Sequence, residues 1–325
     1  MTTVLKKKTI TMKEYLAYEI SSRPAAQIKD IAFPDPIILG GCGSSGTTLL
    51  KTMFDAHKNI ACGQEIAVFD RPLFYQTRVE DLYRMYKNQD FREINPGQIF
   101  PMHTKFGSNF GLFIPNQSKA YHNYATIDKI FQMSRDLRHF VNLFFSNWAD
   151  AQGKKRWAEK TPNNIYCIDR IFEFMPDAKF IHVIRDGRDV ALSLVEARDF
   201  NTASAVFRWL SAVEAGIRHR GNPRYYEVKY EDLITDTENT LKKLMDFLDE
   251  EYDPGMMNYT EKGKKNPLKY GTTPIYTNKI GKWKRTSLDP TFLEIFDLTM
   301  KDMLEKLDYE PTTLKSTKSL SLKKV

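Results

Sequence analysis

The sequence predicts an α/β fold: a mainly parallel sheet flanked by helices, with one inserted helical region. Three short apolar runs carry this prediction, because each leads directly into a segment typical of a helix. The runs are "PIILGGC" at residues 36–42, "AKFIHVIRD" at 178–186 and "RYYEVKY" at 224–230. Strands that alternate with helices favour a parallel sheet, because the crossover helices cover both of its faces.

The first run ends in a glycine-rich turn, and the helical pattern after it begins near residue 47. The spacing of Gly41 and Gly46 fits the Walker pattern, but Thr47 stands where a nucleotide triphosphatase needs lysine. Backbone N–H groups at a helix N-terminus still form a nest for an anion, and hydroxyl groups add donors. The predicted phosphate loop comprises Gly43, Ser44, Ser45, Gly46, Thr47 and Thr48.

The second run ends at Arg185, and Ser193 lies two turns into the helix predicted after it. The planar guanidinium of an arginine at a strand's carboxyl end can hold a phosphate, and the Ser193 hydroxyl can complete the site. For Arg188 and Asp189 we expect a solvated helix start, where an acidic residue is favoured.

Two more segments complete the predicted sheet and its helices. "RWAEKTP" at residues 156–162 predicts a fourth strand end, with Pro162 in the first turn of the next helix. "EDLITDTENTLKKLMDFLDEE" at residues 231–251 carries an apolar stripe and predicts a helix after the third run. Because ligands of such sheets bind beyond the carboxyl ends of the strands, the polar residues there should share one site.

A chain of 325 residues, 42% of them hydrophobic, can bury a large core, and we expect one domain over residues 31–310. Residues 1–30 are a predicted N-terminal extension, and residues 311–325 a predicted basic, flexible tail. Residues 69–150 are rich in aromatic side chains and partly helical by pattern. We interpret them as a cap over an acceptor site.

The net charge of +7 comes from the two ends of the chain. Residues 1–13 and 311–325 each hold four lysines and no acidic residue. The positive charge of these two ends together exceeds the net charge of the whole chain. The body is therefore nearly neutral, which argues against a nucleic-acid groove. The chain lacks an apolar run of roughly 20 residues and a signal-peptide pattern, and its cysteines are few and scattered. We expect a cytoplasmic protein without a transmembrane segment.

Taken together, "GCGSSGTTLL" and "FIHVIRDGRDVALS" resemble the two signature motifs of sulfotransferases that use 3′-phosphoadenosine-5′-phosphosulfate (PAPS). The resemblance implies a P-loop sulfotransferase-like fold in which the loop holds the 5′-phosphosulfate. It also implies that Arg185 and Ser193 hold the 3′-phosphate. Such a loop needs neither the Walker lysine nor a metal ion, which accounts for Thr47.

The resemblance extends toward the tyrosylprotein sulfotransferase branch and its bacterial relatives. "SGTTLLKTMFDAHKNIACGQE" is similar to that branch's first motif, which implies that Glu65 is the catalytic base. "EKTPNN" resembles the segment with its catalytic lysine, here Lys160, and "VKYEDLI" the one whose tyrosine lines the nucleotide site, here Tyr230. "TNKIGKWKR" resembles a basic loop that closes the site, which implies roles for Lys279 and Lys282.

One departure from the family concerns charge. The family has lysine or arginine immediately before "SGT", whereas this chain has Ser44. We expect PAPS binding or turnover to depend instead on Lys160, on the loop amides, or on a cation from elsewhere, such as Lys279 or Lys282. Two alternatives to a PAPS-dependent sulfotransferase stay open at this point: a P-loop nucleotide kinase and a non-catalytic nucleotide-binding relative. The sequence also leaves open the oligomeric state and the acceptor, a hydroxyl or amine on a small molecule, glycan, lipid or peptide.

Overall fold

The computed structural model describes residues 25–63, 65–66, 68–72, 74–87, 121–198, 200–258, 277–286 and 290–310. The predicted tail at 311–325, most of the predicted N-terminal extension and residues 88–120 of the predicted cap lie outside these ranges. The description below applies to the described residues.

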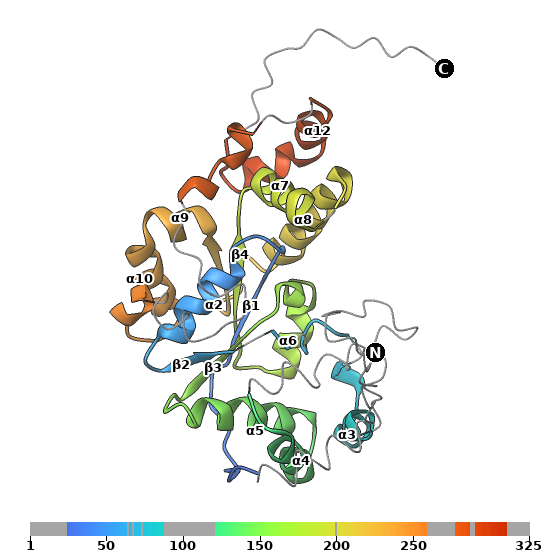
Figure 1. Ribbon diagram of the computed structural model, residues 1–325, viewed down its shortest axis with the longest axis vertical. Helices are drawn as coiled ribbons and strands as arrows, with labels where there is room; N and C mark the ends of the chain where they lie inside the picture. Colours follow the sequence, from blue (N-terminus) through green and yellow to red (C-terminus); the bar gives the residue numbers. More distant parts are fainter. Residues whose placement is uncertain are drawn as a thin grey trace, which may run out of the picture.

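The centre of the fold is a five-stranded parallel sheet in the order β2-β3-β1-β4-β5 (Figure 1). The strands are β1 (Ile37–Gly41), β2 (Ile60–Cys62), β3 (Arg156–Lys160), β4 (Lys179–Ile184) and β5 (Tyr225–Lys229). Ile37 of the central strand pairs with Ala158 on one side and Lys179 on the other. The prediction of a parallel sheet is confirmed, and the sequence analysis missed only the short strand β2.

Side chains of β1 alternate between the two faces of the sheet, as they must in a strand. Ile37 and Leu39 join one core cluster, which contains residues of α2 (Thr47–Ala56) and α10 (Thr237–Leu248). Ile38 joins the cluster on the opposite face, with residues of α5 (Leu137–Asp150) and α8 (Thr202–Ile217). Both faces are therefore covered, which explains why these strands read as continuous apolar runs.

The segment after β5 forms two helices, α9 (Tyr230–Thr235) and α10. Asp236 interrupts the helical pattern with φ −137° and ψ 54°, and its carboxylate accepts a hydrogen bond from the side chain of Asn239 at 2.9 Å. Aspartate competes for such local hydrogen bonds and so favours helix ends over helix interiors. The break allows α9 to follow the end of β5 while α10 packs on the sheet.

The remaining helices are α3 (Val79–Lys87), α4 (Tyr124–Met133), α6 (Ile168–Phe174), α7 (Gly187–Arg198) and α12 (Pro290–Lys306). Short 3-10 helices are η1 (Phe74–Gln76), η5 (Pro162–Cys167), η6 (Pro254–Asn258), η7 (Thr277–Lys279) and η8 (Lys282–Lys284). Within the described residues, every helix is too short or too polar to cross a membrane.

The described part of residues 69–150 packs firmly on the domain. The ring of Phe145 in α5 stacks on Trp157 of β3, with ring centroids 4.5 Å apart. Residues near the start of the described chain also dock here, because the backbone N–H of Lys29 donates to Asn147 at 2.8 Å. That residues 69–150 cover an acceptor stays a prediction.

Candidate functional site

The phosphate loop connects β1 to α2 and contains two residues in the left-handed backbone region. Ser44 has φ 70° and Gly46 has φ 97°. A non-glycine residue in this region costs roughly 1–2 kcal/mol, and such strain clusters at ligand sites. Gly46 must also lack a side chain, because a Cβ there would lie 2.4 Å from Cδ2 of Tyr230. The loop therefore rests directly on the Tyr230 ring.

Arg185 joins the loop to Tyr230. Its guanidinium lies over the Tyr230 ring, 4.5 Å from the centroid, and Nη1 donates to the Ser44 carbonyl at 3.1 Å. The indole of Trp209 in α8 donates to the Arg185 carbonyl at 2.9 Å and so fixes its backbone. The structure brings together three predicted elements, although they are far apart in the sequence: the loop, Arg185 and Tyr230.

One hydrogen-bond donor of the Arg185 guanidinium, Nε, has no partner among the described residues. Its side chain is 8% exposed, and Nη2 donates to the Lys279 carbonyl at 2.7 Å. Among the described residues, no atom accepts a hydrogen bond from its buried Nε. Because buried donors are nearly always paired, an unpaired one beside a phosphate loop indicates a place for an anion.

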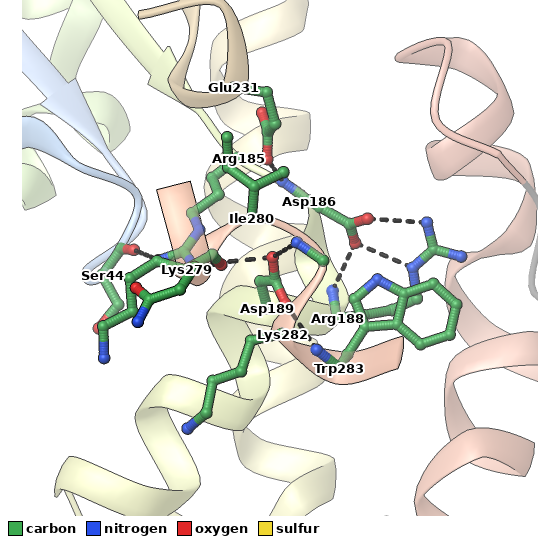
Figure 2. Close-up of polar contacts among 12 residues, drawn as sticks. Ser44, Arg185, Asp186, Arg188, Asp189, Glu231, Lys279, Ile280, Lys282 and Trp283 are labelled. Atoms are coloured by element: carbon green, nitrogen blue, oxygen red, sulfur yellow. Dashed lines mark hydrogen bonds and ion pairs between the residues drawn. The ribbon is translucent and has the colours of Figure 1, made fainter. Parts of the chain in front are cut away.

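Residues 277–286, here called the C-terminal segment, lie against the start of α7 (Figure 2). The Asp189 carboxylate accepts from the backbone N–H groups of Gly281 at 2.7 Å and Trp283 at 2.9 Å. Arg188 lies over the Trp283 ring, 4.0 Å from the centroid. The prediction of a solvated helix start is wrong: Arg188 and Asp189 are both buried, because a segment about 90 residues later in the chain covers them.

The two predicted catalytic residues touch each other. Lys160, the last residue of β3, forms an ion pair with Glu65, which follows β2. Nζ of Lys160 also lies 3.4 Å from Oγ1 of Thr48, in the first turn of α2. The Lys160 side chain is 4% exposed and that of Glu65 is 37% exposed. A buried cation and a more accessible carboxylate thus meet at the edge of the phosphate loop.

Glu159 is a buried carboxylate that the sequence analysis did not consider. It accepts hydrogen bonds from the Thr161 hydroxyl and the Asn164 amide, both at 2.6 Å, and from the Ile66 N–H at 3.5 Å. Burial raises its pKa to about 7, although the hydrogen bonds from Thr161 and Asn164 oppose this shift. Glu159 therefore links the end of β3 to the residue next to Glu65. In the sequence, Glu159 is visible as the first residue of the motif "EKTPNN", directly before Lys160.

Arg198 is the second residue that sequence reasoning missed. Its Nη1 lies 3.9 Å from the place that a Cβ on Gly43 would occupy. Arg198 is the last residue of α7, and Ser193 lies half-buried earlier on the same helix. A cation beside Gly43 offers the charge that Ser44 does not carry. The basic residue was visible in the sequence, but the direction of α7 decides where its guanidinium lies.

The remaining candidates have structural roles or stay untested. Lys282 pairs with Glu196 on α7, and Lys279 contacts Arg185 through its carbonyl. A histidine outside this candidate set, His182 of β4, shares a hydrogen bond of 2.6 Å with the Tyr225 hydroxyl, and burial lowers the pKa of His182 to about 3. Within the described ranges, no cluster of acidic, histidine or cysteine side chains could hold a metal ion.

Comparisons with known proteins show which family the chain resembles. Residues 36–254 match the profile described as "Sulfotransferase family". The chain is 25% identical over 235 residues to a protein-tyrosine sulfotransferase of Drosophila melanogaster, covering 69% of this chain and 40% of that protein. It is 23% identical over 241 residues to an omega-hydroxy-beta-dihydromenaquinone-9 sulfotransferase of Mycobacterium bovis, covering 66% of this chain and 62% of that protein.

A solved structure shows the same fold. The sulfotransferase domain from the Synechococcus olefin synthase aligns with a TM-score of 0.58 at 19% identity, covering 88% of this chain and 99% of that domain. The P-loop sulfotransferase-like fold predicted from the two signature motifs is thus confirmed. The chain spans less than two thirds of the length of both relatives described above.

Proposed function

Because this chain belongs to the sulfotransferase family, we propose that it transfers a sulfuryl group from PAPS to a hydroxyl group of an acceptor. The observation that carries the proposal is the place of Arg185, whose buried Nε has no acceptor among the described residues, beside the phosphate loop. The relatives are named for protein tyrosine and for omega-hydroxy-beta-dihydromenaquinone-9. Both names specify hydroxyl acceptors, which favours a hydroxyl over an amine.

The nucleotide site uses the residues around the loop. We assign the 5′-phosphosulfate to the backbone amides of residues 43–48, and the 3′-phosphate to Arg185 and Ser193. Arg198 beside Gly43 supplies positive charge near the loop, in place of the basic residue that Ser44 replaces. Tyr230 forms one wall, since it contacts both Gly46 and Arg185.

Catalysis rests on Glu65 and Lys160. PAPS supplies the sulfuryl group, and its transfer resembles phosphoryl transfer, in which negative charge develops on the leaving oxygen. Lys160 is placed to stabilise that charge, and Glu65 to accept the proton of the acceptor hydroxyl, a contribution of typically ~10²–10⁴-fold. An anionic donor competes with Glu65 for Lys160. Donor binding therefore releases the Glu65 carboxylate toward the acceptor.

The alternative functions make different demands. A nucleotide kinase needs the Walker lysine, which Thr47 replaces, and Mg²⁺. A non-catalytic relative needs no base next to its nucleotide site, whereas here Glu65 pairs with Lys160 at the loop.

Nucleotide binding without metal tests the proposal. Adenosine 3′,5′-bisphosphate should raise the melting temperature in the presence of EDTA, because a ligand that binds only the folded state stabilises it. Turnover of PAPS with a panel of phenols and alcohols should then appear under the same conditions. Stabilisation by ATP with Mg²⁺ and none by the bisphosphate would refute the sulfotransferase proposal. Tight bisphosphate binding without turnover of any acceptor would favour the non-catalytic alternative.

A further inference from the structure

Asp189 makes an unusual set of contacts for a helix residue. Its side chain is fully buried, and its two carboxylate oxygens accept separate backbone N–H groups of the C-terminal segment, those of Gly281 and Trp283. Hydrogen bonds to a charged acceptor are stronger than neutral ones. Asp189 therefore holds the backbone of this segment, and these two hydrogen bonds do not depend on the side chains of the segment.

The same carboxylate also faces Arg185. Its Oδ2, the atom that accepts from Gly281, lies 3.7 Å from Nη2 of Arg185. Nη2 in turn donates to the Lys279 carbonyl, within the C-terminal segment. These three contacts close a ring, and Figure 2 shows Asp189 between Arg185 and the backbone of the segment.

A second contact supports the first. The guanidinium of Arg188 lies over the Trp283 ring, and its Nε and Nη2 donate to the Asp186 carboxylate at 2.9 and 2.8 Å. Asp186 is fixed as well, since its N–H donates to Glu231 at 3.0 Å. The contacts of Asp186 and Glu231, which lie outside the segment, thus hold the Arg188 guanidinium in place against the Trp283 ring.

The other ion pairs of the segment are exposed. Lys282 pairs with Glu196, with side chains 34% and 42% exposed, and Lys284 pairs with Glu310, with 51% and 81% exposed. Exposed pairs contribute little to stability. The buried carboxylate of Asp189 and the stacked Trp283 therefore hold the segment in place.

We propose that Asp189 is a positioning residue that docks the C-terminal segment against Arg185 and so preassembles the nucleotide site. This inference rests on the proposed function, because its consequence is measured as nucleotide binding. Docking orients the Arg185 guanidinium through its hydrogen bond to the Lys279 carbonyl. If the segment docks only a fraction of the time, the apparent affinity for nucleotide falls by that fraction.

The first test measures docking without any nucleotide. Hydrogen–deuterium exchange of the full chain is followed in peptides that contain residues 277–286. Loss of the carboxylate in Asp189→Ala should raise the undocked fraction of the segment and so speed exchange at Gly281 and Trp283 at least about ten-fold, while exchange in the strands stays unchanged. Unchanged exchange in the segment, or faster exchange throughout the chain, would overturn the proposal.

The second test measures the consequence for the site. In Asp189→Ala, the affinity for adenosine 3′,5′-bisphosphate should fall about ten-fold and KM for PAPS should rise equally. The kcat at saturating PAPS should stay within about twofold, because Glu65 and Lys160 are untouched. A lower kcat with unchanged KM would overturn the proposal. Wild-type protein that binds no bisphosphate would instead refute the proposed function, while the exchange measurement still tests docking.

Two further variants make the tests specific. Glu196→Gln on the same helix removes an exposed ion pair to the same segment and should change KM less than about twofold. An effect equal to that of Asp189→Ala would overturn the proposal. Trp283→Leu removes the contact with Arg188 without changing α7, and it decides the question if Asp189→Ala does not fold. It should speed exchange of the segment and weaken bisphosphate binding; no change in either would overturn the proposal.

Discussion

Replacing Glu159 with glutamine should change how the stability of this protein depends on pH. Burial raises the pKa of Glu159 from 4.5 to about 7. The folded protein therefore binds this proton more tightly than the unfolded chain does. Between pH 4.5 and 7 the folded state holds more protons, so the free energy of unfolding falls as pH rises through this range.

The size of the effect follows from the pKa change. Each pKa unit corresponds to about 1.4 kcal/mol, so ionised Glu159 costs about 3 kcal/mol of stability above pH 7. Full burial of the side chain means that solvent screening does not reduce this figure. Glu159→Gln removes the cost at high pH, but it also perturbs the hydrogen bonds with Thr161 and Asn164, a loss of about 1–2 kcal/mol at all pH values.

Urea unfolding of both proteins at pH 5, 6, 7 and 8 measures the effect. The stability of Glu159→Gln relative to wild type should improve by about 2–3 kcal/mol from pH 5 to pH 8. Glu173→Gln is the control, because Glu173 is an exposed residue of α6, and it should follow the wild-type profile. A difference between Glu159→Gln and wild type that stays constant across this range would show that Glu159 is already ionised at pH 5.

Four further predictions concern the proposed site. Arg185→Ala should weaken bisphosphate binding by about 1.5–3 kcal/mol, measured by titration calorimetry, because its hydrogen bonds go to a charged phosphate; an unchanged affinity would remove it from the site. Glu65→Gln should abolish most turnover while bisphosphate still binds, and comparable loss of both would indicate a structural role. Arg198→Ala should raise KM for PAPS, with the difference from wild type shrinking in added salt, since exposed charges are screened; salt-independent loss would contradict a Coulombic role. Gly46→Ala should prevent bisphosphate binding, because its Cβ would meet the Tyr230 ring at 2.4 Å and its φ is 97°; binding at wild-type affinity would show that the loop adapts.

The sequence by itself determined the elements that depend on local patterns. The apolar runs before Gly41 and Arg185 are buried strands, and the glycine-rich turn leads into a helix, because burial periodicity and glycine conformation are properties of neighbouring residues. The resemblance to sulfotransferase motifs then implied site roles for Lys160 and Tyr230, which follow predicted strands at the edge where ligands of parallel sheets bind. Both lie there in the structure.

Tertiary structure alone decided which of these residues touch and which side chains are buried. The strand order puts β3 between β1 and β2, and this places Lys160 against both Thr48 and Glu65. The residues next to Asp189 in the sequence predict a solvated side chain. In the structure the C-terminal segment, about 90 residues later in the chain, covers it. Arg198, the last residue of α7, lies beside Gly43, a residue far from it in the sequence. Contacts between distant segments depend on how the chain packs. The hydrophobic periodicity within one segment does not show which other segment it will contact.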